Sequence, residues 1–213
     1  MERIDMFPTE MWVEELNHID NGDIAKLILK KEQEEPSVET NLEYTVSSAG
    51  GWQSKPDLHH TENTQLQNLL KSIGEVTDEI RNYNQFGKNT ETYCIDMWAS
   101  VNRYRDYHRN HVHLHCNYSG VYYVKTHENC GVIHFIDPRK EKRMLINSDL
   151  YDTANDASFQ RSCNIFTTFV AEPKAGGLII FPNFLEHSVE ANQTHEPRIS
   201  ISFNIMFIPH KSS

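Results

Sequence analysis

The sequence predicts an α+β fold, mainly β, in which N-terminal helices pack on one face of a β-sandwich or jelly roll. Two observations predict it. Helical patterns of apolar residues are confined to residues 1–90, and short strand-like segments dominate residues 91–209. A length of 213 residues suits a single domain with a substantial core. We therefore expect residues 1–213 to form one domain, with a helical and loop part at 1–90 and a β core at 91–209.

Two helices are expected in the N-terminal part. Asn21 or Asp23 can cap the first, which runs through IAKLILKKEQEE with isoleucine and leucine on one face. Apolar residues at helical spacing predict the second helix over residues 63–86, and Gly87 can terminate it. Residues 35–61 lie between the two helices, and their polar composition predicts a loop.

A glycine pair marks a turn within this loop, and strands follow the second helix. Gly50 and Gly51 precede Trp52, which predicts a tight backbone turn that presents an aromatic side chain. Residues 140–162 are polar and too long for a hairpin, so we expect a functional or flexible loop there. Seven segments rich in β-branched and aromatic residues predict the strands: ETYCIDMWASVNRY, HVHLH, YSGVYYV, GVIHFI, NIFTTFVAE, GLIIFP and RISISFNIMF.

Composition excludes several classes of protein. A formal net charge of −10 argues against a general nucleic-acid binder, because phosphate contacts need a basic surface. No apolar run is long enough to cross a membrane, and the acidic N-terminus lacks a signal-peptide pattern. The four cysteines include no CxxC pair, which argues against a zinc ribbon. We expect a cytoplasmic protein that binds neither nucleic acid nor membrane.

The histidines are unevenly distributed. Of 12, four lie between residues 108 and 115, and three of these alternate in His111-Val112-His113-Leu114-His115. On a strand, side chains at i and i+2 share one face, so all three imidazoles would point the same way. Two such imidazoles can bind one metal ion, and imidazole suits iron, zinc, copper and nickel. We favour His111 with His113 as the ligand pair, and His113 with His115 is the alternative.

A metal site needs a further ligand, and His187 is the best candidate because it follows the strand-like segment LIIFP. The terminal segment 198–207 alternates strictly between apolar and polar residues. It is either a half-buried sheet strand with a wet outer face, or a barrel strand with its polar face inward and its apolar face under the helices. Arg198 opens the polar face, and a guanidinium can bind a carboxylate through two hydrogen bonds.

Together these segments resemble a known family, the 2-oxoglutarate/iron(II)-dependent oxygenases of bacteria and phages. The resemblance covers nearly the whole chain and depends on the order and spacing of several motifs. The motifs are Met6-Phe7-Pro8-Thr9, Gly50-Gly51-Trp52-Gln53-Ser54, His111-x-His113 followed by SGVYYV, GVIHFIDPR from Gly131, GLIIFP to Glu186-His187, and RISISFN from Arg198.

The resemblance implies a double-stranded β-helix, a cupin-like jelly roll, that hydroxylates a substrate with release of succinate and CO2. It implies that Fe(II) is bound by His111, His113 and His187, and that O2, 2-oxoglutarate and an unknown substrate meet at this metal. Arg198 would bind the distal carboxylate of 2-oxoglutarate, with Ser200 beside it. A tyrosine of the pair Tyr122 and Tyr123 would assist, although adjacent strand residues face opposite sides.

One departure from the wider superfamily matters. That superfamily uses His-x-Asp or His-x-Glu, whereas His113 occupies the second position here. Asp106 and Asp137 are the fallback carboxylates. A metal-binding β-helix without turnover and a three-histidine oxygenase without 2-oxoglutarate therefore remain as alternatives. The sequence indicates neither the oligomeric state nor the substrate, whose candidate surroundings are Trp52, Trp98, Asn102 and residues 140–162.

Overall fold

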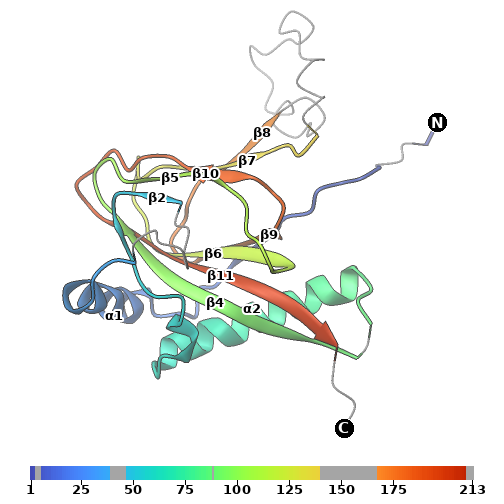
Figure 1. Cartoon of the computed structure of the whole chain (residues 1–213), viewed down its shortest axis with the longest axis horizontal. Coiled ribbons are helices and arrows are strands. Elements are labelled where there is room, and N and C mark those ends of the chain that lie inside the picture. The colour runs from blue at the N-terminus through green and yellow to red at the C-terminus, as the bar shows by residue number, and fades with distance from the viewer. Residues whose placement is uncertain (3–5, 39–46, 88, 140–166, 210–213) are drawn as a thin grey trace, which may run out of the picture.

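The computed structural model describes residues 1–2, 6–38, 47–87, 89–139 and 167–209 (Figure 1). Within this part of the chain, two antiparallel β-sheets face each other and two helices cover the outer face of the larger sheet (Figure 1). The larger sheet has the order β1 (Trp12–Glu15), β9 (Gly177–Pro182), β6 (Tyr118–Lys125), β11 (Arg198–Pro209), β4 (Thr90–Asn102) and β3 (Trp52–Gln53). The smaller sheet has the order β2 (Ser48–Ala49), β5 (Tyr107–His111), β10 (His187–Val189), β7 (Ile133–Ile136) and β8 (Thr168–Ala171).

The helices form where the sequence predicts them, with different ends. Helix α1 (Asn21–Glu34) is capped by Asp20, whose Oδ1 accepts the backbone N–H groups of Gly22 and Asp23 at 2.9 and 3.2 Å. The prediction of Asn21 or Asp23 as the cap was therefore wrong by one to three residues, because the aspartate ahead of both already satisfies the free N–H groups.

Helix α2 (Thr64–Tyr83) is capped by Asn63 and ends at Asn84. Gly87 does not terminate it, since the Asn84 N–H already bonds to the Ile80 carbonyl at 3.0 Å. A short 3₁₀ helix, η1 (Leu58–His60), precedes α2 inside the segment expected to be a loop.

The core lies between the helices and the larger sheet. The side chains of Ile199, Ile201 and Phe203 on β11 are fully buried, and they share one cluster with Ile24 of α1 and Leu69 of α2. The polar side chains of β11 therefore face the interior between the sheets. This agrees with a barrel strand whose polar face points inward, and not with a half-buried strand whose polar face points to solvent. The α+β prediction with helices on one face is confirmed.

Some local predictions fail or lie outside the described residues. The expected strand over HVHLH ends at His111, and His115 has a left-handed φ of 63°. Strands β1, β2 and β3 were not predicted. Residues 140–162, Cys163 and the start of the segment NIFTTFVAE lie outside the residues that the structure describes.

The predicted glycine turn is confirmed. Gly50 and Gly51 have φ values of 78° and 72°, and they carry the chain from β2 in one sheet to β3 in the other. A Cβ on Gly50 would lie 2.1 Å from Oδ1 of Asp106, so the close approach itself requires glycine. Among the described helices, none is long and apolar enough to cross a membrane.

Candidate metal and cosubstrate site

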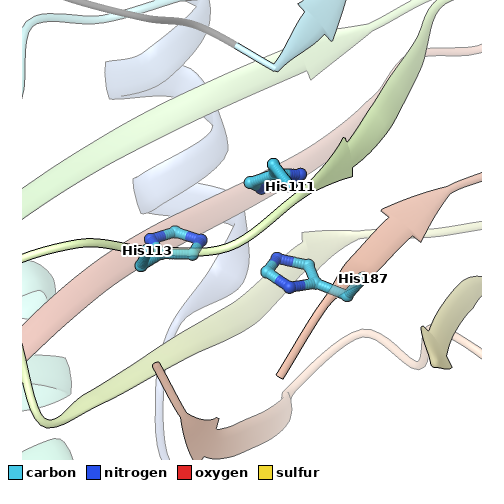
Figure 2. A group of neighbouring side chains, drawn as sticks. All are labelled: His111, His113 and His187. Carbon is cyan, nitrogen blue, oxygen red and sulfur yellow. The ribbon is translucent and has the colours of Figure 1, made fainter. Parts of the chain in front are cut away.

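Three histidines meet between the two sheets. The potential ligand atoms of His111, His113 and His187 all lie within 4.8 Å of one another, and their rings converge in Figure 2. His111 ends β5 and lies directly opposite His187, the first residue of β10, in the antiparallel register. His113 follows the end of β5, where its N–H bonds to the Asn183 carbonyl at 3.1 Å. The structure therefore brings together the three predicted ligands.

Each of the three rings is oriented by a hydrogen bond from its Nδ1. His111 donates to the Arg109 carbonyl at 2.7 Å, and His187 donates to the Leu185 carbonyl at 2.9 Å. His113 donates to Oδ1 of Asn204 at 2.8 Å. Because each acceptor requires the proton to be on Nδ1, Nε2 of each neutral ring is unprotonated and can bind a metal.

Burial keeps these rings neutral. It lowers the pKa of His113 to about 4, with a further contribution from His111. Burial followed by the neighbouring His111 lowers the pKa of His187 to about 2, and burial lowers the pKa of His111. A neutral imidazole is the form that binds a metal, so the three side chains are ready to act as ligands at physiological pH.

The donor set fits iron(II), because imidazole nitrogen is a normal ligand of that ion. Within the described residues, no carboxylate joins the three-histidine group. The two fallback carboxylates have other partners. Asp106 accepts a hydrogen bond from the backbone N–H of Arg103 at 2.7 Å, and Asp137 accepts one from Nη2 of Arg139 at 2.8 Å. The exposed His115 also lies outside the group.

Arg198 is buried in the same interior, with 1% of its surface exposed. Its Nη1 donates to the carbonyls of Cys130 and Gly131 at 2.6 and 3.2 Å, and its Nη2 donates to Oδ1 of Asn102 at 3.2 Å. A Cβ on Gly131 would lie 2.9 Å from Nη1, so glycine makes room for the guanidinium. None of the described carboxylates forms an ion pair with Arg198.

One cavity joins Arg198 to the three histidines, and Ser200 and Tyr123 also line it. Burial raises the pKa of Tyr123, so its phenol stays protonated and can donate a hydrogen bond. The structure does not bring Tyr122 to this cavity. The Tyr122 hydroxyl donates to Oδ1 of Asn21 at 2.7 Å on the helical side of the sheet.

His108 is a fourth cavity histidine, which the sequence analysis did not assign to the site. The pairing of β5 with β10 contains a bulge. His187 pairs with His111 and Val189 pairs with His108, so a step of two residues along β10 corresponds to a step of three along β5. This bulge turns both His108 and His111 inward, although strict alternation would put them on opposite faces. Only the unusual density of histidines in this segment could have drawn attention to His108.

His108 is hydrogen-bonded through both nitrogens. Its Nε2 donates to Oδ1 of Asn102 at 3.1 Å, and its Nδ1 accepts from the Ser47 hydroxyl at 3.3 Å. Burial, and then the Arg198 guanidinium, lower the pKa of His108 to about 3. The neutral ring therefore shares with Arg198 the Asn102 oxygen that fixes the guanidinium.

The candidate aromatic residues fall in different places. Trp98 lines the cavity and stacks on His113 with ring centroids 5.9 Å apart. Trp52 is a core residue that is 6% exposed, and its Nε1 donates to the Glu35 carbonyl at 3.0 Å. Trp98, unlike Trp52, can therefore contact a molecule bound in the cavity.

Comparison with known proteins defines the class. Residues 96–204, which include the three converging histidines and Arg198, match the family model "Putative 2OG-Fe(II) oxygenase". The chain belongs to this family of 2-oxoglutarate- and iron(II)-dependent oxygenases. A search of curated proteins found no match.

Solved structures show the same fold at low sequence identity. A prolyl-4-hydroxylase from Pseudomonas putida has a TM-score of 0.57 at 13% identity over 92% of each chain. The epimerase SnoN in complex with Fe3+, alpha ketoglutarate and nogalamycin RO has a TM-score of 0.59 at 13% identity over 93% of this chain and 79% of that one. HygX from Streptomyces hygroscopicus, with nickel and 2-oxoglutarate bound, has a TM-score of 0.53 at 11% identity over 93% and 83%.

These findings confirm the double-stranded β-helix. As a member of the family that residues 96–204 match, the protein is an oxidoreductase that depends on Fe(II) and uses 2-oxoglutarate and O2 as co-substrates.

Proposed function

We propose that this oxygenase binds Fe(II) through His111, His113 and His187, and hydroxylates a substrate that enters between the sheets. Arg198 then binds the distal carboxylate of 2-oxoglutarate. One observation carries the proposal: a single cavity is lined by three neutral imidazoles and by a buried guanidinium. Among the described residues, no carboxylate pairs with this guanidinium. The two groups suit the two ends of a 2-oxo diacid.

The buried charge supports the assignment of Arg198. An unpaired charge inside a protein is strongly unfavourable, and carbonyl or amide oxygens neutralise none of it. The Cys130 and Gly131 carbonyls and the Asn102 amide hold the guanidinium in place, and Asp106 acts on it through space, but a bound carboxylate would supply a directly bonded negative charge. A cosubstrate that carries its own carboxylate meets this requirement.

The residues of the chain position and shield the reactants. Iron, when bound, supplies the O2 activation that couples decarboxylation of 2-oxoglutarate to oxidation of the substrate. Hydrogen bonds from the three Nδ1 atoms hold the ligand rings in one orientation. Phe181 and Ile133 add apolar walls to the cavity, and apolar walls around reacting groups disfavour water there.

We further propose that residues 1–213 form one domain. Helices α1 and α2 share a hydrophobic cluster with β4, β6 and β11, the strands that also form the floor of the cavity. Separating the N-terminal part would therefore expose the apolar face of β11 to water.

Tyr123 and Tyr122 provide a matched test of the cosubstrate site. We expect Tyr123→Phe to weaken 2-oxoglutarate binding by about 10-fold or more, because a hydrogen bond to a charged carboxylate contributes roughly 1.5–3 kcal/mol. Tyr122→Phe removes the same atom on the other side of the sheet and should leave this affinity unchanged. Calorimetric titration of 2-oxoglutarate into Ni(II)-loaded protein measures both. Absence of binding to the wild-type protein would overturn the proposed function, and equal effects of the two variants would exclude a direct role for Tyr123.

A further inference from the structure

Asn204 connects one of the proposed ligands to a carboxylate. Its Oδ1 accepts hydrogen bonds from Nδ1 of His113 at 2.8 Å and from the Ser119 hydroxyl at 2.9 Å, and the Cys116 thiol lies 3.8 Å away. Its Nδ2 donates to Oδ2 of Asp96 at 3.2 Å. Asn204 is 8% exposed and Asp96 is half-buried, so the chain of hydrogen bonds runs from the interior toward the surface.

The chemistry of the partners allows only one orientation of the amide. A carboxylate accepts hydrogen bonds and cannot donate them, so Nδ2 of Asn204 must face Asp96. Oδ1 must then face His113, and it can accept only if His113 carries its proton on Nδ1. Asp96 therefore determines, through Asn204, that Nε2 of His113 is the free nitrogen.

The sheet holds these residues in register. Asn204 lies directly opposite Asp96 on β4 and opposite Ser119 on β6, so the amide is fixed from both neighbouring strands. The other two ligand histidines donate instead to backbone carbonyls, those of Arg109 and Leu185. Of the three, His113 is thus the one whose partner is a side chain.

We infer that Asn204 and Asp96 are positioning residues that fix the tautomer of His113 and place a carboxylate two hydrogen bonds from the metal site. This inference rests on the proposed role of His113 as a ligand. Within the described residues, the three-histidine group includes no carboxylate, and this amide links the group to the carboxylate of Asp96. A hydrogen bond to a charged acceptor polarises the amide, and the polarised amide makes the imidazole a stronger donor to the metal.

The test exchanges the two residues. Asn204→Leu removes the acceptor of His113, and we expect it to weaken Co(II) binding by about 10- to 100-fold. The double variant Asn204→Asp with Asp96→Asn keeps both hydrogen bonds and moves the charge one link closer to His113, so Co(II) affinity should return to the wild-type value or exceed it. Calorimetry measures the affinities. Nitrogen NMR of histidine-labelled, metal-free protein reports the tautomer of His113, which should be protonated on Nδ1 in the wild-type and exchanged proteins and mixed in Asn204→Leu.

Two further variants complete the test. Asn117→Ala removes an amide that accepts the Phe207 N–H beside the same strand pair, and it should change neither the affinity nor the nitrogen signals. Asp96→Ala alters a half-buried residue, so it tests the pair even if Asn204→Leu does not fold. We expect it to produce mixed tautomer signals and a several-fold loss of Co(II) affinity.

The inference is overturned if a folded Asn204→Leu or Asp96→Ala protein keeps the wild-type nitrogen signals and Co(II) affinity. It is also overturned if the exchanged variant binds Co(II) no better than Asn204→Leu. Failure of the wild-type protein to bind Co(II) at all would instead contradict the proposed function, while the metal-free nitrogen signals would still test the orientation of His113.

Discussion

Replacing His187 with alanine should abolish most metal binding while leaving the fold intact. His187 is one of the three converging imidazoles, and the described part of the chain offers no fourth side chain within this group. Loss of a residue that merely orients a ligand typically costs 10- to 100-fold in metal affinity, so loss of a ligand itself should cost more than about 100-fold. Metal content after dialysis against Co(II), with circular dichroism to verify folding, measures the effect.

His115→Ala is the matched control for this variant. His115 is exposed and lies outside the three-histidine group, so its removal should leave Co(II) binding unchanged. The same control separates the two ligand pairs that the sequence allowed. If His115→Ala loses the metal and His111→Ala does not, then His113 pairs with His115 and the assignment made here is wrong.

Arg198→Met should have the second largest effect, on the cosubstrate and not on the metal. Hydrogen bonds to charged groups contribute roughly 1.5–3 kcal/mol, so we expect 2-oxoglutarate affinity to fall by about 10- to 100-fold. Arg198 contacts none of the three histidines by a hydrogen bond, so Co(II) affinity should barely change. Titrations of Co(II) and then of 2-oxoglutarate into the same protein separate the two effects.

Arg103→Met controls for the loss of a positive charge. Arg103 pairs with Glu32 and its side chain is 48% exposed, so it lies outside the cavity. Its replacement should leave both affinities unchanged. Equal 2-oxoglutarate affinity in the wild-type and Arg198→Met proteins would mean that another group binds the distal carboxylate.

Periodicity predicted the fold because the longest elements have strongly alternating or helical patterns. The alternation of residues 198–207 identified β11 and both of its faces, although the face that points inward became clear only from the packing of α1 and α2. Strands β2 and β3 have two residues each, which is too short for any periodic pattern to be recognised. The sequence did predict the Gly50-Gly51 turn, which carries the chain from β2 in one sheet to β3 in the other.

The candidate site was predictable where residue type and spacing together indicated chemistry. His111, His113, His187 and Arg198 were chosen for imidazole and guanidinium groups at expected positions, and the structure places all of them around one cavity. The reason given for His113 was incomplete, since it lies beyond the end of β5, where Asn183 holds its backbone.

Residues whose role depends on tertiary register were not predictable. His108 faces inward because of a bulge in β5, and a single sequence does not reveal bulges. Asn204 meets Asp96 across two strands whose register no local pattern specifies. Asn204 has an ordinary polar side chain whose partners His113 and Asp96 are distant in the sequence.

The most direct test of the account is the anaerobic visible spectrum of the Fe(II)-loaded protein during titration with 2-oxoglutarate and, separately, with pyruvate. Both compounds carry the 2-oxo acid that chelates iron, but only 2-oxoglutarate carries a distal carboxylate for Arg198. The account predicts a visible charge-transfer band that saturates at a concentration at least about tenfold lower for 2-oxoglutarate than for pyruvate. Absence of the band with 2-oxoglutarate, or saturation by both compounds at the same concentration, would contradict a cosubstrate that spans from the three histidines to Arg198.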